Sequence, residues 1–123
     1  MDRENVPDSV ILMCAKIAHE VNRRLKQFYG EEDFRTWDQM SDNEKNRAIT
    51  GVRTVIQKKD CTPQEIHNAW MDSMRKDGWV YGPYLDTVKR TNPNLVPYME
   101  LPDAQKLKDH LYLGVITSML DLQ

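Results

Sequence analysis

One short segment of the chain, KDGWVYGPY (residues 76–84), gathers the residue types that can bind a flat, charged ligand. It contains three aromatic residues, two glycines and one proline, and basic residues lie on both sides of it. Aromatic faces stack on nucleobases, each stack being worth about 1–3 kcal/mol, and Lys and Arg supply charge for phosphate. Glycine lets the backbone approach a ligand closely. The candidate ligand-binding residues are Trp70, Arg75, Lys76, Trp79, Tyr81, Gly82, Lys89, Arg90 and Tyr98.

The same aromatic residues have two other uses that the sequence leaves open. They can form the core of a small domain, since the chain has only two phenylalanines and Trp70 falls on the apolar face of a predicted helix. They can also anchor a protein–protein interface, where Trp, Tyr and Arg are the usual hot-spot residues. A concave pocket between the rings would indicate a small ligand, whereas an exposed apolar patch would indicate a protein partner.

We find no motif for catalysis or metal binding. His19, His67 and His110 lie on different predicted helices, and none has a second ligand at the spacing of a zinc site. The chain contains no GxSxG, P-loop or GxGxxG motif. We therefore expect no enzymatic activity, no metal and no cofactor, and expect each histidine to be hydrogen-bonded at the margin of the core. An enzyme acting on nucleotides, with His19 or His67 as acid–base group, is a minor alternative.

Composition narrows the class of protein. The 123 residues suit one domain, and the net charge of −2 disfavours nucleic acid as a partner. The longest apolar run, VILMC (residues 10–14), is too short to cross a membrane, and the polar N-terminal segment is not a secretory signal. Cys14 and Cys61 lack metal-binding spacing, and Cys14 is expected to be reduced and buried. We expect a cytoplasmic protein, in the host cytoplasm if a phage encodes it.

The periodicity of apolar residues predicts a mostly α fold with a minor β component. The second and third of four helices begin with capping boxes, at Ser41 and Glu44 and at Thr62 and Glu65. Short strands are expected near residues 79–82 and 95–98, and these could pair. Helices are predicted over Asp8–Tyr29, 41–57, 62–77 and from Pro102 onward. The last helix is expected to turn one stripe toward the core, formed by Leu107, Leu111, Val115, Ser118 and Met119.

The two halves of the chain resemble each other faintly. Trp37 and the helix that starts after it match Tyr98 and the helix that starts after it, with a shift of 61 positions. His19 matches His67 with a shift of 48 positions. The pattern predicts two pseudo-symmetric helix–connector–helix repeats within one domain, a degenerate one over about 9–57 and a second over about 62–120. The second connector is the longer one, and it contains GWVYGPY.

A longer pattern resembles a known family. His67-x-x-Trp70, GWVYG at residues 78–82 and LVPY at residues 95–98 are similar to the ryanodine-receptor-type repeat, or RyR domain, over about Thr62–Leu120. The whole chain looks like the small stand-alone members of this family in bacteriophage and bacterial genomes. The family usually has histidine where Asn92 stands here, which removes any role for an imidazole at that position.

The resemblance implies a compact helical fold with short strands, built from pseudo-symmetric pairs of repeats. It also implies a non-catalytic module that binds a nucleotide or a nucleotide-derived signal, such as an adenine nucleotide or an ADP-ribose-like compound, in phage–host defence or counter-defence. The alternative is an adaptor that uses the same aromatic cluster as a protein interface. Ligand identity and oligomeric state are left open by the sequence.

Overall fold

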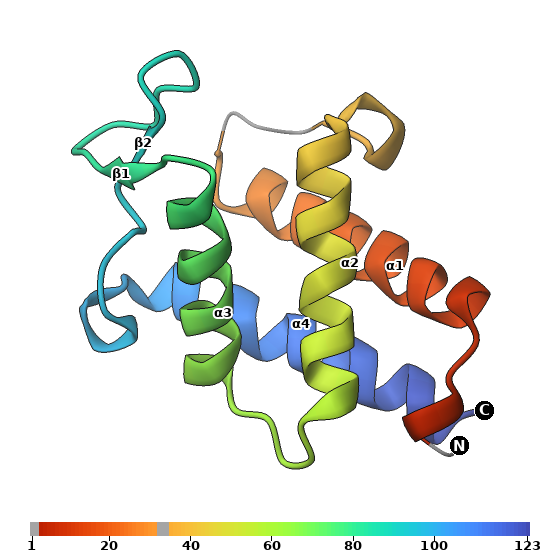
Figure 1. Ribbon diagram of the computed structural model, residues 1–123. Coiled ribbons are helices and arrows are strands. Elements are labelled where there is room, and N and C mark those ends of the chain that lie inside the picture. The colour runs from red at the N-terminus through yellow and green to blue at the C-terminus, as the bar shows by residue number, and fades with distance from the viewer. Residues whose placement is uncertain (1–2, 32–34) are drawn as a thin grey trace.

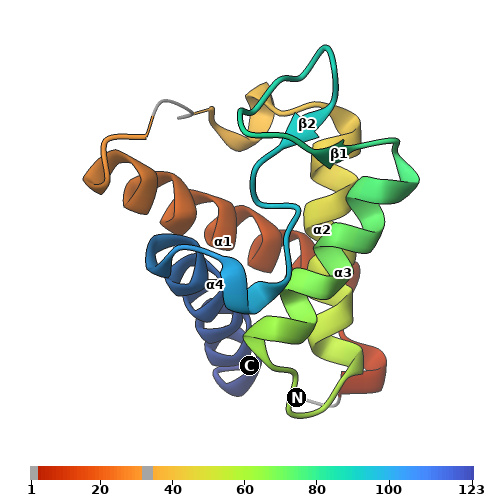
Figure 2. The same ribbon diagram turned by 90° about the vertical axis from the view of Figure 1, so that its left-hand side faces the viewer.

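The computed structural model describes residues 3–31 and 35–123. Its four long helices form two layers, with α2 and α3 side by side across α1 and α4 (Figures 1 and 2). The longer connector, between α3 and α4, carries two short strands and lies at the same end of the molecule as the α1–α2 connector. This confirms a mostly α fold with minor β structure. The elements are α1 (Asp8–Phe28), α2 (Asp42–Gln57), α3 (Pro63–Lys76), β1 (Val80–Tyr81), β2 (Thr91–Asn92) and α4 (Asp103–Asp121), with 3-10 helices η1 (Arg3–Asn5), η2 (Trp37–Gln39) and η3 (Tyr98–Glu100).

Local chemistry explains where the helices begin and end. The backbone N–H of Glu44 donates to the Ser41 hydroxyl at 3.2 Å, and that of Glu65 donates to the Thr62 hydroxyl at 3.2 Å. Both glutamates accept a backbone N–H in return, so the two predicted capping boxes are confirmed. Glycines with positive φ follow α1 and α3, at +72° for Gly30 and +86° for Gly78. This left-handed conformation, which glycine adopts without steric cost, ends both helices.

The main core lies between α1, α2 and α4, and it also receives Ile66 from α3. Val52, Val55 and Ile116 are completely buried at its centre. Cys14 and Cys61 belong to this core as free thiols, which confirms that Cys14 is reduced and buried. Burial raises the pKa of both thiols, so each stays protonated and behaves as a small apolar side chain.

The predicted core-facing stripe of α4 is confirmed at Met119, which packs against the core, but not at its leucines. Ile116 and Leu120 are the buried residues of this helix, whereas Leu107 and Leu111 are exposed. Tyr112 sets the rotation, because its ring packs against the core and its hydroxyl donates to the carbonyl of Ala48 at 3.1 Å. A Cβ atom at Gly51 would lie 2.6 Å from that hydroxyl, so a glycine in α2 makes room for the tyrosine.

The predicted strand near residues 79–82 is confirmed, but the one near 95–98 is wrong. β1 pairs in parallel with β2, where the N–H of Val80 donates to the carbonyl of Arg90 at 2.9 Å. Pro93 has no N–H to extend this pairing. The chain then turns so that Leu95 is buried among side chains of α3, and residues 98–100 form η3. Leu95 therefore anchors the connector instead of belonging to a strand.

No described helix is both long and apolar enough to span a membrane. In the same parts of the chain, no group of three or more His, Cys, Asp and Glu side chains is arranged to hold a metal ion.

Candidate functional site

The predicted aromatic residues divide between a small core and the surface. Met71, Met74 and Leu95 form a second apolar cluster, against which Trp70 and Trp79 pack. We call these three residues the small core. Trp70 and Trp79 are thus half-buried packing residues. Tyr81 instead is exposed on β1.

His67 links two of these aromatic residues. Trp70 stacks on its imidazole, with ring centroids 5.6 Å apart and an angle of 28°, and Tyr98 lies 6.2 Å away at 55°. The side chain is only 3% exposed, and its Nε2–H donates to the carbonyl of Val96 at 2.7 Å. Burial lowers the pKa of His67, so the neutral form is favoured. The histidine therefore holds the connector on α3, in agreement with the predicted hydrogen-bonded role.

The predicted basic residues do not converge on a common point. Arg90 donates to the backbone carbonyl of Asp77 at the end of α3, and the Asp77 carboxylate accepts a hydrogen bond of 2.5 Å from Arg47 of α2. Arg75 points its guanidinium toward the sulfur of Met71 at 3.9 Å. The remaining predicted cations, Lys76 and Lys89, are exposed.

Gly82 also has a packing role. It is buried, and a Cβ atom there would lie 2.5 Å from the Cβ of Thr91. The close approach that glycine allows here is therefore to the neighbouring strand. One contact was not foreseen, since the Lys106 ammonium lies 5.7 Å from the centre of the Tyr98 ring. This cation–π geometry occupies one side of the tyrosine.

The α3–α4 connector exposes several large apolar side chains, from β1 to the loop before β2. Its five large apolar side chains are between 56% and 91% exposed. Scattered apolar side chains are normal on a surface, but several in one loop mark a candidate interaction site. We call this surface the insert tip, consisting of Val80, Tyr81, Tyr84, Leu85 and Val88.

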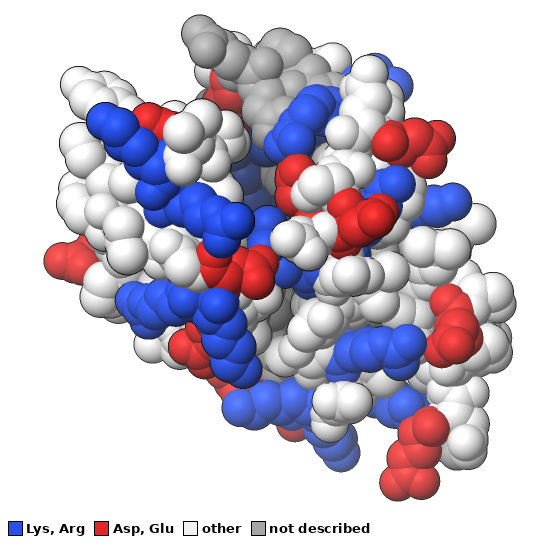
Figure 3. Space-filling view, turned by 45° about the horizontal axis from the view of Figure 1, so that its top comes forward, with Lys and Arg blue, Asp and Glu red and all other residues white. Residues whose placement is uncertain are grey.

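A polar hollow lies in the first half of the chain, where the sequence predicted no site. Its volume is about 100 Å³. Figure 3 shows Lys and Arg side chains bordering a depression on the face that carries the insert and the start of α2. A second cavity of about 310 Å³, next to Cys61 and His110, contains none of the predicted ligand-binding residues either. The hollow is lined by His19, Asn22, Arg23 and Lys26 of α1, Arg35 and Met40 of the connector and Glu44 of α2.

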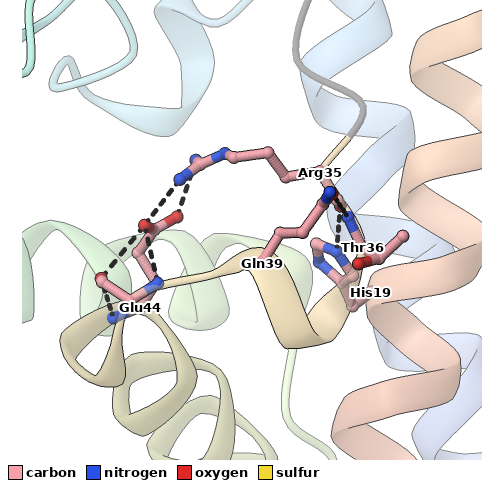
Figure 4. A network of polar contacts seen from close by, with 6 residues as sticks. His19, Arg35, Thr36, Gln39 and Glu44 are labelled. Atoms are coloured by element: carbon pink, nitrogen blue, oxygen red, sulfur yellow. Dashed lines mark hydrogen bonds and ion pairs between the residues drawn. The ribbon is translucent and has the colours of Figure 1, made fainter.

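Hydrogen bonds fix the rim of the hollow (Figure 4). The Arg35 guanidinium reaches from the connector to α2 and donates to both oxygens of Glu44, at 2.9 and 2.8 Å. Burial alone would raise the pKa of Glu44, but hydrogen bonds from Arg35 and Ser41 hold it below its ordinary value. His19 of α1 donates through Nε2 to the Arg35 carbonyl at 2.8 Å, which joins the connector to α1. Helix and connector are therefore held in place on both sides of the hollow.

The lining combines positive charge with an unsatisfied acceptor. Arg23, Lys26 and Arg35 line the hollow together with Glu44, and each cation has a partner, since Arg23 donates to Glu20 at 2.7 Å, Arg35 donates to Glu44 at 2.8 Å and Lys26 is also engaged. The side-chain oxygen of Asn22 is buried and has no hydrogen-bond partner among the described residues. An unsatisfied buried acceptor costs about 1–3 kcal/mol. The hollow therefore has a polar lining, and the Asn22 oxygen is buried beneath its surface.

One signal in the sequence pointed to this hollow. His19, Asn22, Arg23 and Lys26 follow one another at steps of three, one and three, so they share one face of α1. A polar face of this kind is ordinarily exposed to solvent. Here the connector packs over this face of α1, and the hollow is enclosed between them.

The family model named RyR domain matches residues 53–120. This span covers more than half of the chain. The chain belongs to the RyR domain family. The match runs from the second half of α2 through α3, the two strands and α4, so the residues that line the hollow lie outside the matched part of this RyR domain protein.

Proposed function

We propose that this RyR domain protein is a non-catalytic recognition module that binds a small anionic ligand of the nucleotide type at the polar hollow. The observation that carries the proposal is the basic lining of the hollow, to which Arg23, Lys26 and Arg35 contribute. A nucleotide is complementary to this lining because its phosphates are anionic. The aromatic cluster around His67 then stabilises the domain.

The size of the hollow limits what enters it. Pockets for complete drug-sized ligands measure about 300–1,000 Å³, and an apolar cavity of about 150 Å³ holds benzene. A hollow of about 100 Å³ therefore accepts a group smaller than benzene, such as one phosphate group. The remainder of the ligand lies on the surface around it, among the basic side chains.

Replacing Lys26 with Gln should weaken nucleotide binding about tenfold or more, because a charge-assisted hydrogen bond is worth about 1.5–3 kcal/mol. Calorimetric titration with ATP and ADP-ribose measures the change. The control is Lys16→Gln, which removes the same charge from an exposed position of α1. At 100 times its dissociation constant the ligand should also stabilise the wild-type protein by about 2.7 kcal/mol. Equal affinities for both variants, or a nucleotide that is chemically altered on incubation, would contradict this proposal.

The insert tip supports a second candidate function, docking onto a protein partner. Val88 is 91% exposed, and none of the predicted aromatic residues lines either of the two cavities described above. Burial of an exposed apolar side chain contributes about 25 cal/mol per Å². A partner with an apolar groove would therefore gain most from the tip of the insert.

Docking predicts that the double variant Leu85→Ser, Val88→Ser loses its partner while the domain stays folded. Affinity capture from the native host, with quantitative mass spectrometry, should show several-fold lower recovery of the partner. Met99→Ser is the control, since Met99 is also exposed but lies on η3 away from the insert tip. Equal recovery with all three proteins would count against docking at this surface.

A further inference from the structure

One side of α4 is apolar although the fold does not bury it. Leu107 and Leu111 are 39% and 36% exposed, and Leu122, directly after the helix, is 82% exposed. Gly114 and Ser118 lie between them and are also exposed. These positions follow one another at steps of three and four, so they share one side of the helix. We call this surface the α4 stripe, consisting of Leu107, Leu111, Gly114, Val115, Ser118 and Leu122.

The core does not account for the α4 stripe. The core takes the opposite side of the helix, where Ile116 and Leu120 are buried. No Asp, Glu, Lys or Arg belongs to the α4 stripe, whereas the solvent side of a surface helix ordinarily carries charged and polar residues. A helix that is apolar on two opposite sides is typical of one that is covered on both. The α4 stripe therefore has the character of an interface.

Gly114 indicates that a helix approaches the α4 stripe closely. A glycine within a helix costs about 1 kcal/mol relative to alanine. Gly51 of α2 has a reason inside the molecule, because it makes room for Tyr112. A Cβ atom at Gly114, in contrast, would meet no described atom within 4 Å outside its own helix. The distance between two packed helices depends on the side chains at their contact, so a glycine with a serine one turn later permits a close approach.

The spacing of the α4 stripe is the same in both directions along the helix. Its members follow one another at steps of four, three, one, three and four. Two copies of α4 that run antiparallel, with a two-fold axis between Gly114 and Val115, therefore place Leu107 of each copy opposite Leu122 of the other. A two-fold interface requires such a surface that is complementary to itself.

Side-chain sizes are also complementary in the antiparallel pair. Leu111 of one copy is opposite Ser118 of the other, and Val115 is opposite Gly114. Large side chains opposite small ones fill the space between two packed helices. In a parallel pair each residue would face its own counterpart, so leucine would meet leucine and glycine would leave a gap. Size therefore favours the antiparallel pair.

Charge favours the same direction. Asp121 is the one charged residue of α4 after His110, and it is exposed. In the antiparallel pair it lies beside the first turns of the other helix, next to Lys106 and His110. Asp109 of those turns is seven residues before Ile116 and is thus on the core side of the helix. In a parallel pair Asp121 would face the same carboxylate of the second copy.

We propose that the α4 stripe is the contact surface of a homodimer, in which two α4 helices pack antiparallel about a two-fold axis between Gly114 and Val115. The partner is a second copy of this chain. Interfaces of stable complexes bury about 800 Å² per partner, and one helix from each copy forms a smaller contact. The dimer is therefore weak and reversible.

The first test measures mass against concentration. Sedimentation equilibrium of the wild type over about 1–500 µM should show a reversible equilibrium between monomer and dimer, as for a small interface. Leu111→Gln and Gly114→Gln should each raise the dissociation constant about tenfold or more, since both residues are central to the contact. Gly114→Gln should not lower the melting temperature at low concentration, because its side chain meets open space and glutamine favours a helix. Leu12→Gln is the control, since Leu12 of α1 is 37% exposed against 36% for Leu111.

Three results of this test would overturn the proposal. The first is a wild type that stays monomeric over the whole range. The second is a dimer of Leu111→Gln or Gly114→Gln that is as stable as that of the wild type. The third is a loss of the dimer in Leu12→Gln as large as in Leu111→Gln, which would place the contact away from the α4 stripe.

The second test concerns the direction of the helices. Cys14 and Cys61 are buried, so a thiol introduced on the surface reports the contact between copies. Val115→Cys places two thiols next to the two-fold axis, and oxidised glutathione should link them. In Ser118→Cys the two positions are about 10 Å apart along the helices, farther than the Cα separation of about 7 Å that a disulfide spans. Linking of Val115→Cys without Ser118→Cys is expected, and linking of both to the same extent, or of neither, overturns the antiparallel pair.

Discussion

Raising the pH from 4.5 to 8 is expected to destabilise the Asp109→Asn variant less than the wild type. The change in the free energy of unfolding over this range should be about 3 kcal/mol more favourable for the variant than for the wild type. Burial raises the pKa of the Asp109 carboxyl from 3.8 to about 7, against the opposing effect of Lys108. The folded protein therefore keeps this carboxyl protonated at a pH where the unfolded chain has lost the proton. Stability falls as pH rises toward 7, by about 1.4 kcal/mol per pH unit for one such group, and asparagine removes this loss because it cannot ionise.

Urea denaturation of both proteins at the two pH values measures the effect. His67 contributes with the opposite sign, since its lowered pKa makes stability rise with pH, but it is present in both proteins and cancels in the difference. Asp72→Asn is the control, because Asp72 is exposed on α3 and its replacement should change little at either pH. A difference between Asp109→Asn and wild type that does not change with pH would show that the carboxyl ionises normally.

Trp70→Ala is expected to lower the free energy of unfolding by about 3 kcal/mol. Truncation of a buried tryptophan costs about 3–5 kcal/mol, and the low end applies because Trp70 is half-buried. The loss has two sources, the stack on His67 and the contacts with the small core. Because the small core also holds Leu95 of the connector, the insert should lose protection from amide hydrogen exchange before α1 does.

Equilibrium denaturation gives the magnitude, and hydrogen exchange gives the location. Tyr84→Ala serves as the matched control, since it removes an aromatic ring that is 78% exposed at the insert tip and should cost less than about 0.5 kcal/mol. If Trp70→Ala cost as little as Tyr84→Ala, Trp70 would be free for a ligand and its packing role would be wrong.

Helix positions could be predicted because they depend on neighbouring residues. Ser41 with Glu44 and Thr62 with Glu65 satisfy the first N–H groups of their helices, and Gly78 supplies the left-handed residue that ends α3. Residues three or four positions apart in a helix contact each other regardless of how the rest of the chain folds. The second strand was misplaced for the opposite reason, since burial of Leu95 in the small core decides the path of the connector.

The sequence placed the candidate site in the second half of the chain, whereas the polar hollow lies in the first half. Aromatic and basic residues close together in sequence indicated a ligand-binding platform between Trp70 and Tyr98. The fold directs Trp70 and Trp79 into the small core and Arg90 to the backbone of Asp77. Whether those residues contact a ligand stays a prediction, and so does the division of the chain into two repeats.

The sequence alone therefore determined the family, the four helices and the caps that begin and end them, because these follow from residue types at short, regular spacing. Only the tertiary structure decided which face of α4 is buried, since that depends on Tyr112 fitting against Gly51 of another helix. It also decided that a hollow exists at all. Its lining comes from α1, the connector and α2. The hollow exists because the side chains of these three segments do not fill the space between them, which depends on how the segments pack.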